Sequence, residues 1–269
     1  MIDSEIYILC DMEGITGAAT CEQDVYPDAP NYPKARRWLT ADLETAMAGA
    51  HEAGADHFTV YDMHFQGTNI LADHLHLACT IIRGKPFLSG LREGVKGMFM
   101  IGLHAMAGNE RGVMPHTYNH EIQRIELNGM AVGEIGLEAA GAGSYGIPLI
   151  LVVGDQEGCE EARWLLGPIE TVAVKWLDDK GRVVLKPAEE SRQEIFEAAQ
   201  RAVRRAAELK PLRISGHCEL RIVCRDSAFR DKLCNKCGGA PEGENSLLLQ
   251  GPDVRAVYEH FRRSQVRAT

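Results

Sequence analysis

Short apolar stretches alternate with amphipathic segments over the first 155 residues. Four of the stretches are rich in Ile, Val, Leu, Phe or Met and end in polar residues or glycine, as buried strands do. The predicted strands are residues 5–10, 57–61, 98–102 and 148–153. Apolar residues at helical spacing predict helices over 33–53 and 133–145. This alternation predicts an α/β fold with a largely parallel sheet flanked by helices.

The pattern changes after Gly154. A long amphipathic helix is predicted over residues 189–209, an alternating strand over 212–224 and a closing helix over 254–263. We therefore expect an α/β core over residues 1–155 and a smaller α+β portion over residues 156–269. The smaller portion is expected to complete a site on the core, to form an oligomer interface, or both.

Ionisable side chains follow three of the predicted strands. Asp11 and Glu13 come after the first strand, His64 after the second and His104 after the third. Because functional groups in open α/β sheets gather outside the carboxyl ends of the strands, these side chains are expected to lie together. Glu134 stands near the start of the predicted helix 133–145, where it could face the same edge.

Two imidazoles and three carboxylates make a mixed nitrogen and oxygen ligand set, which suits zinc, manganese or cobalt better than calcium. Five donors exceed what one catalytic zinc uses, whereas two metals that share a bridging carboxylate would use all five. Each residue alone has a simpler explanation, since an Asp at a strand end often caps a helix and a His there is often a hydrogen-bonded core or surface residue. The repetition at three strand ends favours a metal site.

A polar loop around His116 follows His104 closely. His116 could reach the same edge, and imidazole is the usual acid/base group near neutral pH. The alternative is an ordinary loop histidine in solvent. His120, in the same loop, is expected to be structural.

Charge and composition exclude several classes of protein. The net charge of −9 and the scattered lysines and arginines argue against a nucleic-acid-binding protein. No apolar run approaches the ~20 residues of a membrane span and no signal-peptide pattern opens the chain, so we expect a soluble cytoplasmic protein without membrane contact. The eight cysteines lack the spacing of a secreted scaffold. Cys234 and Cys237 form a C-x-x-C motif, but the five residues between Cys218 and Cys224 do not match a zinc ribbon.

In order and spacing, the motifs resemble those of the zinc-dependent D-aminopeptidases of the bacterial dipeptide-transport (DppA) type. The likeness covers roughly the first 175 residues and is thin beyond them. It is carried by Asp11-Met12-Glu13-Gly14, Asp62-x-His64, Gly102-x-His104, Val113-Met114-x-His116 and Val132-Gly133-Glu134-x-Gly136-Leu137. Cys10, before the first motif, departs from the family pattern and adds a thiol that could act as a soft ligand.

The resemblance implies a metallo-aminopeptidase that hydrolyses the N-terminal amide bond of short peptides or aminoacyl amides, with D-residues slightly favoured over L-residues. It implies two zinc ions per chain, for which manganese or cobalt could substitute. Asp11 would bridge the ions, Glu13 and His64 would complete one site, and His104 and Glu134 would complete the other.

The resemblance further implies that His116 is the catalytic residue, as nucleophile or as general acid/base. It also implies that the chain assembles into a large ring-like homo-oligomer. Residues 1–155 would then be the metal-binding catalytic core.

Two other hypotheses stay open. A metal-dependent phosphoesterase also uses paired metals on an α/β sheet, but among the cations only Arg111 and Lys175 are expected near the ligands. A non-catalytic homologue that binds metal or peptide is the second alternative, and the presence of His116 argues against it.

Overall fold

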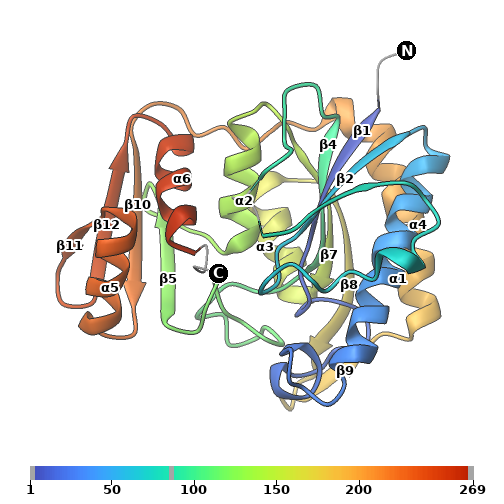
Figure 1. Cartoon of the computed structure of the whole chain (residues 1–269), viewed down its shortest axis with the longest axis horizontal. Coiled ribbons are helices and arrows are strands. Elements are labelled where there is room, and N and C mark those ends of the chain that lie inside the picture. Colours follow the sequence, from blue (N-terminus) through green and yellow to red (C-terminus); the bar gives the residue numbers. More distant parts are fainter. Residues whose placement is uncertain (1–3, 85–87, 266–269) are drawn as a thin grey trace.

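Two sheets organise the chain (Figure 1). The computed structural model describes residues 4–84 and 88–265. The larger sheet has seven strands in the order β3-β2-β1-β4-β7-β8-β9, and all neighbours run parallel except β8 and β9. The strands are β1 (Glu5–Cys10), β2 (His57–Asp62), β3 (Thr80–Ile82), β4 (Gly97–Leu103), β7 (Leu149–Asp155), β8 (Glu170–Leu177) and β9 (Val183–Leu185).

The four predicted strands are β1, β2, β4 and β7, each within two residues of the expected ends. Every residue of β1, β4 and β7 is buried. A strand covered on both faces is apolar at successive positions, which is why these strands were readable in the sequence.

Helices cover both faces of the larger sheet, as Figure 1 shows. On one face α1 (Tyr32–Glu52) and α4 (Ala188–Arg205) pack against Ile6 and Ile8 of β1. On the other face α2 (Glu134–Gly143) and α3 (Gln156–Leu166) pack in the cluster that contains Tyr7 and Leu9. Short helical turns occupy Cys21–Val25, Ala72–His74 and Ala206–Glu208. The expected α/β fold is confirmed.

The second sheet is antiparallel, with the order β11-β12-β10-β5-β6. Its strands are β5 (Ile122–Leu127), β6 (Met130–Ala131), β10 (Cys218–Cys224), β11 (Ala240–Glu242) and β12 (Ser246–Gly251). The strand expected over residues 212–224 begins only at Cys218, because the preceding segment runs past α2, where the carbonyl of Leu212 closely approaches Gly143.

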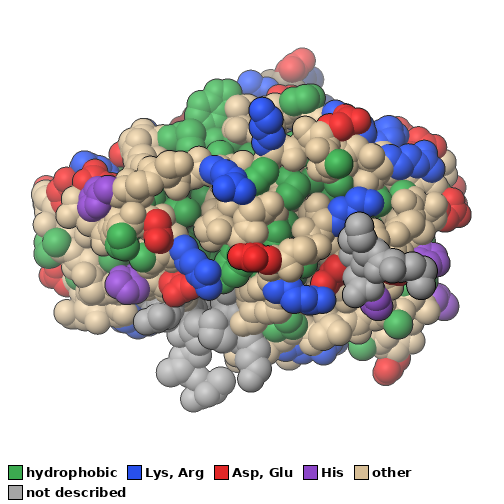
Figure 2. Space-filling view, turned by 90° about the horizontal axis from the view of Figure 1, so that it is seen from above, with side chains coloured by type: hydrophobic (Ala, Val, Ile, Leu, Met, Phe, Trp, Pro, Cys, Tyr) green, Lys and Arg blue, Asp and Glu red, His purple; other side chains and the backbone are tan. Residues whose placement is uncertain are grey.

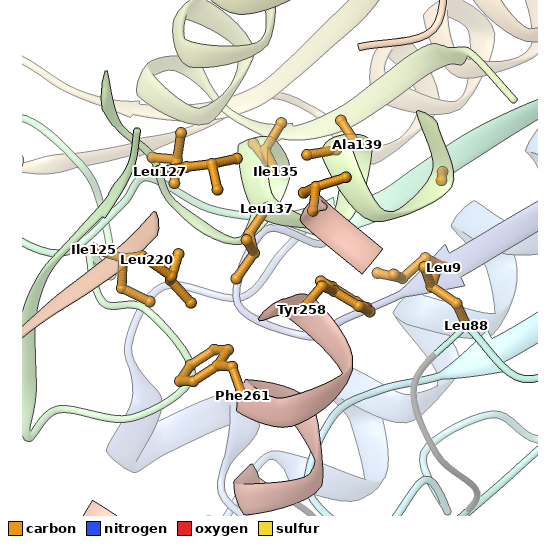
Figure 3. Packing of buried hydrophobic residues seen from close by; sticks show 14 of the residues in the cluster. Leu9, Leu88, Ile125, Leu127, Ile135, Leu137, Ala139, Leu220, Tyr258 and Phe261 are labelled. Atoms are coloured by element: carbon orange, nitrogen blue, oxygen red, sulfur yellow. The ribbon is translucent and has the colours of Figure 1, made fainter. Parts of the chain in front are cut away.

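The helices α5 (Ser227–Cys237) and α6 (Val254–Gln265) accompany the second sheet. Figure 3 shows Tyr258 and Phe261 of α6 near Leu137 of α2 and near Ile125 and Leu220 of the second sheet. These side chains belong to one buried apolar cluster that also includes Leu9 of the larger sheet. The two sheets therefore share a core.

Both sheets draw strands from either side of residue 155. The strands β5 and β6 come before it and lie in the second sheet, whereas β8 and β9 come after it and extend the larger sheet. The division into residues 1–155 and 156–269 stays a prediction.

The surface mixes charges of both signs. On the face seen in Figure 2, Lys and Arg side chains lie apart from one another with Asp and Glu side chains between them. Among the helices of the described residues, none combines the length and apolar character needed to cross a membrane.

Candidate metal centre and active site

The candidate site lies where the strand order of the larger sheet reverses. From β1 the chain builds β2 and β3 on one side and then returns to place β4 on the other side of β1. Ligands of open α/β sheets bind outside the carboxyl ends of the strands at such a switch point. Asp11 directly follows β1 and His104 directly follows β4.

Two glycines let the loop after β1 pack against the end of β4. The amide of Gly14 donates to the carbonyl of Gly102 at 2.7 Å. A Cβ on Gly14 would lie 1.8 Å from the carbonyl oxygen of Leu103, and a Cβ on Gly102 would lie 2.1 Å from that of Asp11. Gly102 also has a φ of +82°, which side chains disfavour. The close approach holds Asp11 beside His104.

The five predicted ligands come together in a buried cluster. His64 Nδ1 lies 3.0 Å from Asp11 Oδ1 and 3.2 Å from Glu13 Oε2. His104 Nε2 lies 3.4 Å from both Asp11 Oδ2 and Glu134 Oε1. Asp11 therefore presents one carboxylate oxygen to each imidazole.

His116 joins the same cluster. Its ring stacks on the ring of His104 with a centroid distance of 4.0 Å, and its Nε2 lies 3.9 Å from Glu13 Oε1 and 4.0 Å from Glu134 Oε1. The side chain is nine-tenths buried, so the alternative of a loop histidine in solvent is wrong. The ring of His120 is tilted by 32° against that of His116 at a centroid distance of 4.9 Å, and its Nε2 lies 3.2 Å from the hydroxyl of Tyr26.

One nitrogen of each cluster histidine is tied to a backbone carbonyl. His64 Nε2 lies 2.9 Å from the oxygen of Val25, and the Nδ1 atoms of His104 and His116 lie 3.0 Å from those of Ala105 and Met114. A carbonyl only accepts, so each of these nitrogens carries a proton. The other nitrogen of each ring faces the carboxylates, as in histidines that bind metal.

The charges of the cluster call for a cation. Burial lowers the pKa of His64, yet Glu13 and Asp11 hold it well above its ordinary value. Burial likewise lowers the pKa of His104, and Glu134 and Asp11 reverse that effect. Nε2 of His104 is buried and has no hydrogen-bond partner among the described residues. A metal ion between the rings and the carboxylates would satisfy these atoms, so the residues fit a metal.

The pKa of His116 is shifted in the opposite direction, below its ordinary value. Burial and the neighbouring His104 lower its pKa, and the carboxylates Glu13 and Glu134 only partly oppose them. A neutral imidazole whose Nδ1 bears the proton leaves Nε2 as a proton acceptor facing the cluster.

Two sets of donor atoms lie close enough to hold an ion. One set is Asp11, Glu13 and His104, and the other is His104, His116 and Glu134. The expected sites paired Glu13 with His64, which the contact at 3.2 Å allows, and left His116 outside the ligands. The geometry brings His116 within reach of an ion as well. Neither set contains Cys234 or Cys237.

Two buried residues that the sequence analysis did not assign hold the cluster in place. Lys175 Nζ donates to the carbonyls of Glu13 and Ala18, at 2.6 Å each, and burial lowers its pKa to about 8. Glu161 accepts hydrogen bonds from the amides of Gly133 and Gly136, at 2.8 and 3.3 Å, and so fixes the start of α2. The role of Lys175 could have been suspected from the sequence, because this lysine stands among the apolar residues of β8.

Other residues of the motifs lie outside the cluster. Asp62 accepts from the amides of Asn69 and Ile70, at 2.7 and 3.0 Å, and thereby shapes the loop that carries His64. Cys10 packs in the apolar core, and burial raises the pKa of its thiol. Its sulfur belongs to neither of the two sets of donor atoms.

The cluster opens into a cavity of about 450 Å³, within the ~300–1,000 Å³ of small-molecule sites. Three cations from the far end of the chain line it: Lys232, Lys236 and Arg262. Of the two cations expected near the ligands, Lys175 does lie beside Glu13, whereas Arg111 does not, and the three cations of the cavity were not expected. Arg111 pairs with Glu157 at 2.9 Å, away from this cavity, and Lys175 is turned toward backbone carbonyls.

Comparisons with known proteins show the family to which the chain belongs. A family model described as D-aminopeptidase matches residues 5–263. A D-aminopeptidase of Bacillus subtilis (strain 168) is 32% identical over 215 residues, which cover 77% of each chain. The solved structure of the Zn-dependent D-aminopeptidase DppA from Bacillus subtilis, described as a self-compartmentalizing protease, has a TM-score of 0.90 at 27% identity and covers 95% of this chain and 94% of that chain. The likeness thus extends well beyond residue 175, and the chain belongs to the D-aminopeptidase family of metallo-aminopeptidases.

Proposed function

We propose that this protein is a zinc-dependent aminopeptidase that removes the N-terminal residue of short peptides or aminoacyl amides, with a preference for D-residues. The observation that carries the proposal is the arrangement around Asp11, whose two oxygens face the imidazoles of His64 and His104. A carboxylate in this position suits a bridge between two metal ions. The zinc dependence and the D-preference draw on the relatives.

Two zinc ions would be held by five side chains. Asp11 would bridge them, Glu13 and His64 would complete one site, and His104 and Glu134 would complete the other. Bound zinc lowers the pKa of water toward ~7 and polarises a carbonyl, which is the chemistry that amide hydrolysis needs. Lys175 and Glu161 would keep Glu13 and Glu134 in position through the adjacent backbone.

His116 would handle the proton. Its Nδ1 is fixed by the carbonyl of Met114, so Nε2 points toward the carboxylates at the base of the cavity. From there Nε2 can take up a proton and deliver it to the leaving amine. The stacking on His104 keeps the ring in this orientation.

We also propose that the chain works as a large ring-like homo-oligomer in the cytoplasm. The description of the Bacillus relative as self-compartmentalizing supports the assembly. All eight cysteines are free thiols, which suits a reducing compartment.

Hydrolysis assays with metal-depleted protein test the function. The protein is reloaded with zinc, manganese or cobalt and offered D- and L-dipeptides and the matching aminoacyl amides. We expect hydrolysis only after reloading, at higher kcat/KM for D-residues. Full activity after exhaustive chelation would overturn the metal mechanism, and equal kcat/KM for both enantiomers would overturn the stereochemical part.

One observation favours a second function, that of a metal-dependent phosphoesterase. The cations Lys232, Lys236 and Arg262 could hold a phosphate next to the metals. The same reloaded samples should therefore be offered p-nitrophenyl phosphate. Hydrolysis of this ester without hydrolysis of any peptide would favour the phosphoesterase.

A further inference from the structure

The cavity carries opposite charges on different elements. The carboxylates of Asp11, Glu13 and Glu134 come from the carboxyl edge of the larger sheet and the start of α2, whereas the three cations come from α5 and α6. Lys232 and Lys236 are exposed and lie one turn apart on α5, and Arg262 on α6 is only 8% exposed. The metal ligands use none of these three cations.

Tyr118 connects Arg262 to the metal cluster. The guanidinium carbon of Arg262 lies 4.1 Å above the ring of Tyr118, whose backbone amide donates to Glu134 Oε1 at 2.7 Å. Tyr118 has a φ of +62°, a left-handed conformation that bulky side chains disfavour, so the surrounding contacts hold it there. Tyr118 therefore contacts both the guanidinium of Arg262 and Glu134, a proposed zinc ligand.

Glu138 contacts both Tyr118 and Arg262 and so holds them in place. It accepts from the hydroxyl of Tyr118 at 2.5 Å and from that of Tyr258, and its Oε1 lies 3.7 Å from Nε of Arg262. This network orients the guanidinium beside the cavity that the metal cluster shares.

A guanidinium held by packing is suited to a carboxylate, because its planar fork can bind both oxygens and its partial burial strengthens the attraction. A short peptide whose N-terminal amide lies at the metals carries its only fixed anion at the other end. An aminoacyl amide or a peptide with a blocked C-terminus has no such charge.

We propose that Arg262, Lys232 and Lys236 form a subsite for the C-terminal carboxylate of the substrate. Short peptides with a free carboxylate are then preferred over amides and blocked peptides. This inference rests on the proposed function, which places the N-terminal amide bond at the metals.

Paired substrates test the subsite. The zinc-loaded enzyme is assayed with a dipeptide and with the same dipeptide as its C-terminal carboxamide. We expect kcat/KM to be about tenfold or more higher for the free acid, as a charge-assisted contact provides. The double variant Lys232→Gln/Lys236→Gln, which changes only exposed side chains, should reduce that ratio at least twofold through the KM of the free acid. The control Lys180→Gln/Lys210→Gln makes the same charge change at two exposed positions outside the cavity and should keep the wild-type ratio.

Arg262 is tested together with Glu138, because replacing the arginine alone would leave the buried carboxylate of Glu138 without its charged partner. The double variant Arg262→Gln/Glu138→Gln removes both partners and should lower the ratio more than the lysine double variant does, with folding checked by circular dichroism. A wild-type ratio in both double variants would overturn the subsite.

A binding measurement separates the subsite from the activity. Calorimetry compares a dipeptide analogue whose amide is reduced to CH₂–NH with the carboxamide of that analogue. Tighter binding of the free acid by wild type, lost in the two double variants, supports the subsite even if no peptide is hydrolysed, in which case the proposed function fails alone. Equal binding of both analogues, together with normal hydrolysis, overturns the subsite and leaves the proposed function standing.

Discussion

The imidazole rings of His104 and His116 lie nearly parallel, with 8° between their planes and 4.0 Å between their centroids. The pKa of His104 is held up against burial by Glu134 and Asp11, whereas burial and His104 itself lower the pKa of His116. His116 borders the cavity, and His104 is buried behind it with 1% of its surface exposed. The stacked pair thus separates into an inner ring suited to bind a metal and an outer ring suited to exchange a proton.

Replacing His116 by Ala should lower kcat by about 10²–10⁴-fold, the usual contribution of a positioned acid/base, while the zinc content stays at the wild-type level. Steady-state kinetics and elemental analysis of the same preparation measure both quantities. His104→Ala is the matched comparison and should lose zinc as well as rate. Loss of zinc from the His116 variant would make His116 a ligand, and a near-normal kcat would remove it from the chemistry.

The proposed bridging role of Asp11 predicts unequal effects of two ligand variants. Asp11→Ala should bind neither zinc ion, because each ion would lose a shared donor, whereas His64→Ala should weaken mainly one. Elemental analysis after dialysis against a defined free-zinc buffer counts the ions per chain. Two ions retained by Asp11→Ala would show that another carboxylate forms the bridge.

Lys175 is expected to stabilise the metal site through the backbone. Lys175→Met leaves the carbonyls of Glu13 and Ala18 buried without their donor, so the free energy of unfolding should fall by about 2–4 kcal/mol. Zinc affinity should fall by about 10–100-fold, as for other residues that orient ligands. Urea denaturation and competition with a chromogenic chelator give the two values. Lys180→Met, at an exposed turn, is the control, and an unchanged zinc affinity in Lys175→Met would refute the positioning role.

Asp42 should make the stability depend on pH. Burial is the main cause that raises its pKa from 3.8 to about 6, although the amide of Thr16 donates to it at 2.8 Å. Between pH 3.8 and 6 the unfolded chain ionises this group and the folded chain does not, so its contribution to stability is full below this window and is lost as pH rises through it. Asp42→Asn should therefore match wild type near pH 4 and exceed its free energy of unfolding by roughly 2–3 kcal/mol at pH 7.

Urea denaturation of both proteins with excess chelator, at intervals from pH 4 to pH 7, measures that difference without the contribution of bound metal. A difference that stays constant across the range would contradict the raised pKa of Asp42.

The proposed ring predicts a large particle. The chain should elute far above its monomer mass of 29.6 kDa, and light scattering should report one discrete multiple of that mass. If the metals serve catalysis alone, chelation should abolish activity without dissociating the oligomer. A fully active monomer would refute the assembly and leave the chemistry untouched.

Part of the fold was readable because the central strands are buried on both faces. The continuous apolar runs of β1, β4 and β7 follow directly from that burial. The strand β8 was not predicted, since only Val172, Val174 and Lys175 in it are buried and the lysine interrupts its apolar residues. The helix α5 was also missed, because most of its surface is polar and only Leu233 and Cys237 are buried.

The sequence by itself determined the positions of Asp11, Glu13, His64 and His104, because parallel strands must end at a common edge and a residue just past a strand has nowhere else to lie. The tertiary structure decided which atoms meet. The two oxygens of Asp11 contact two different imidazoles because Gly14 and Gly102 allow the backbones of two loops to approach closely. Lys232, Lys236 and Arg262 line the cavity because α6 packs on α2. Such contacts join residues that lie from 53 positions apart, for Asp11 and His64, to 120 positions apart, for Glu138 and Tyr258, and only the packing of the shared core specifies them.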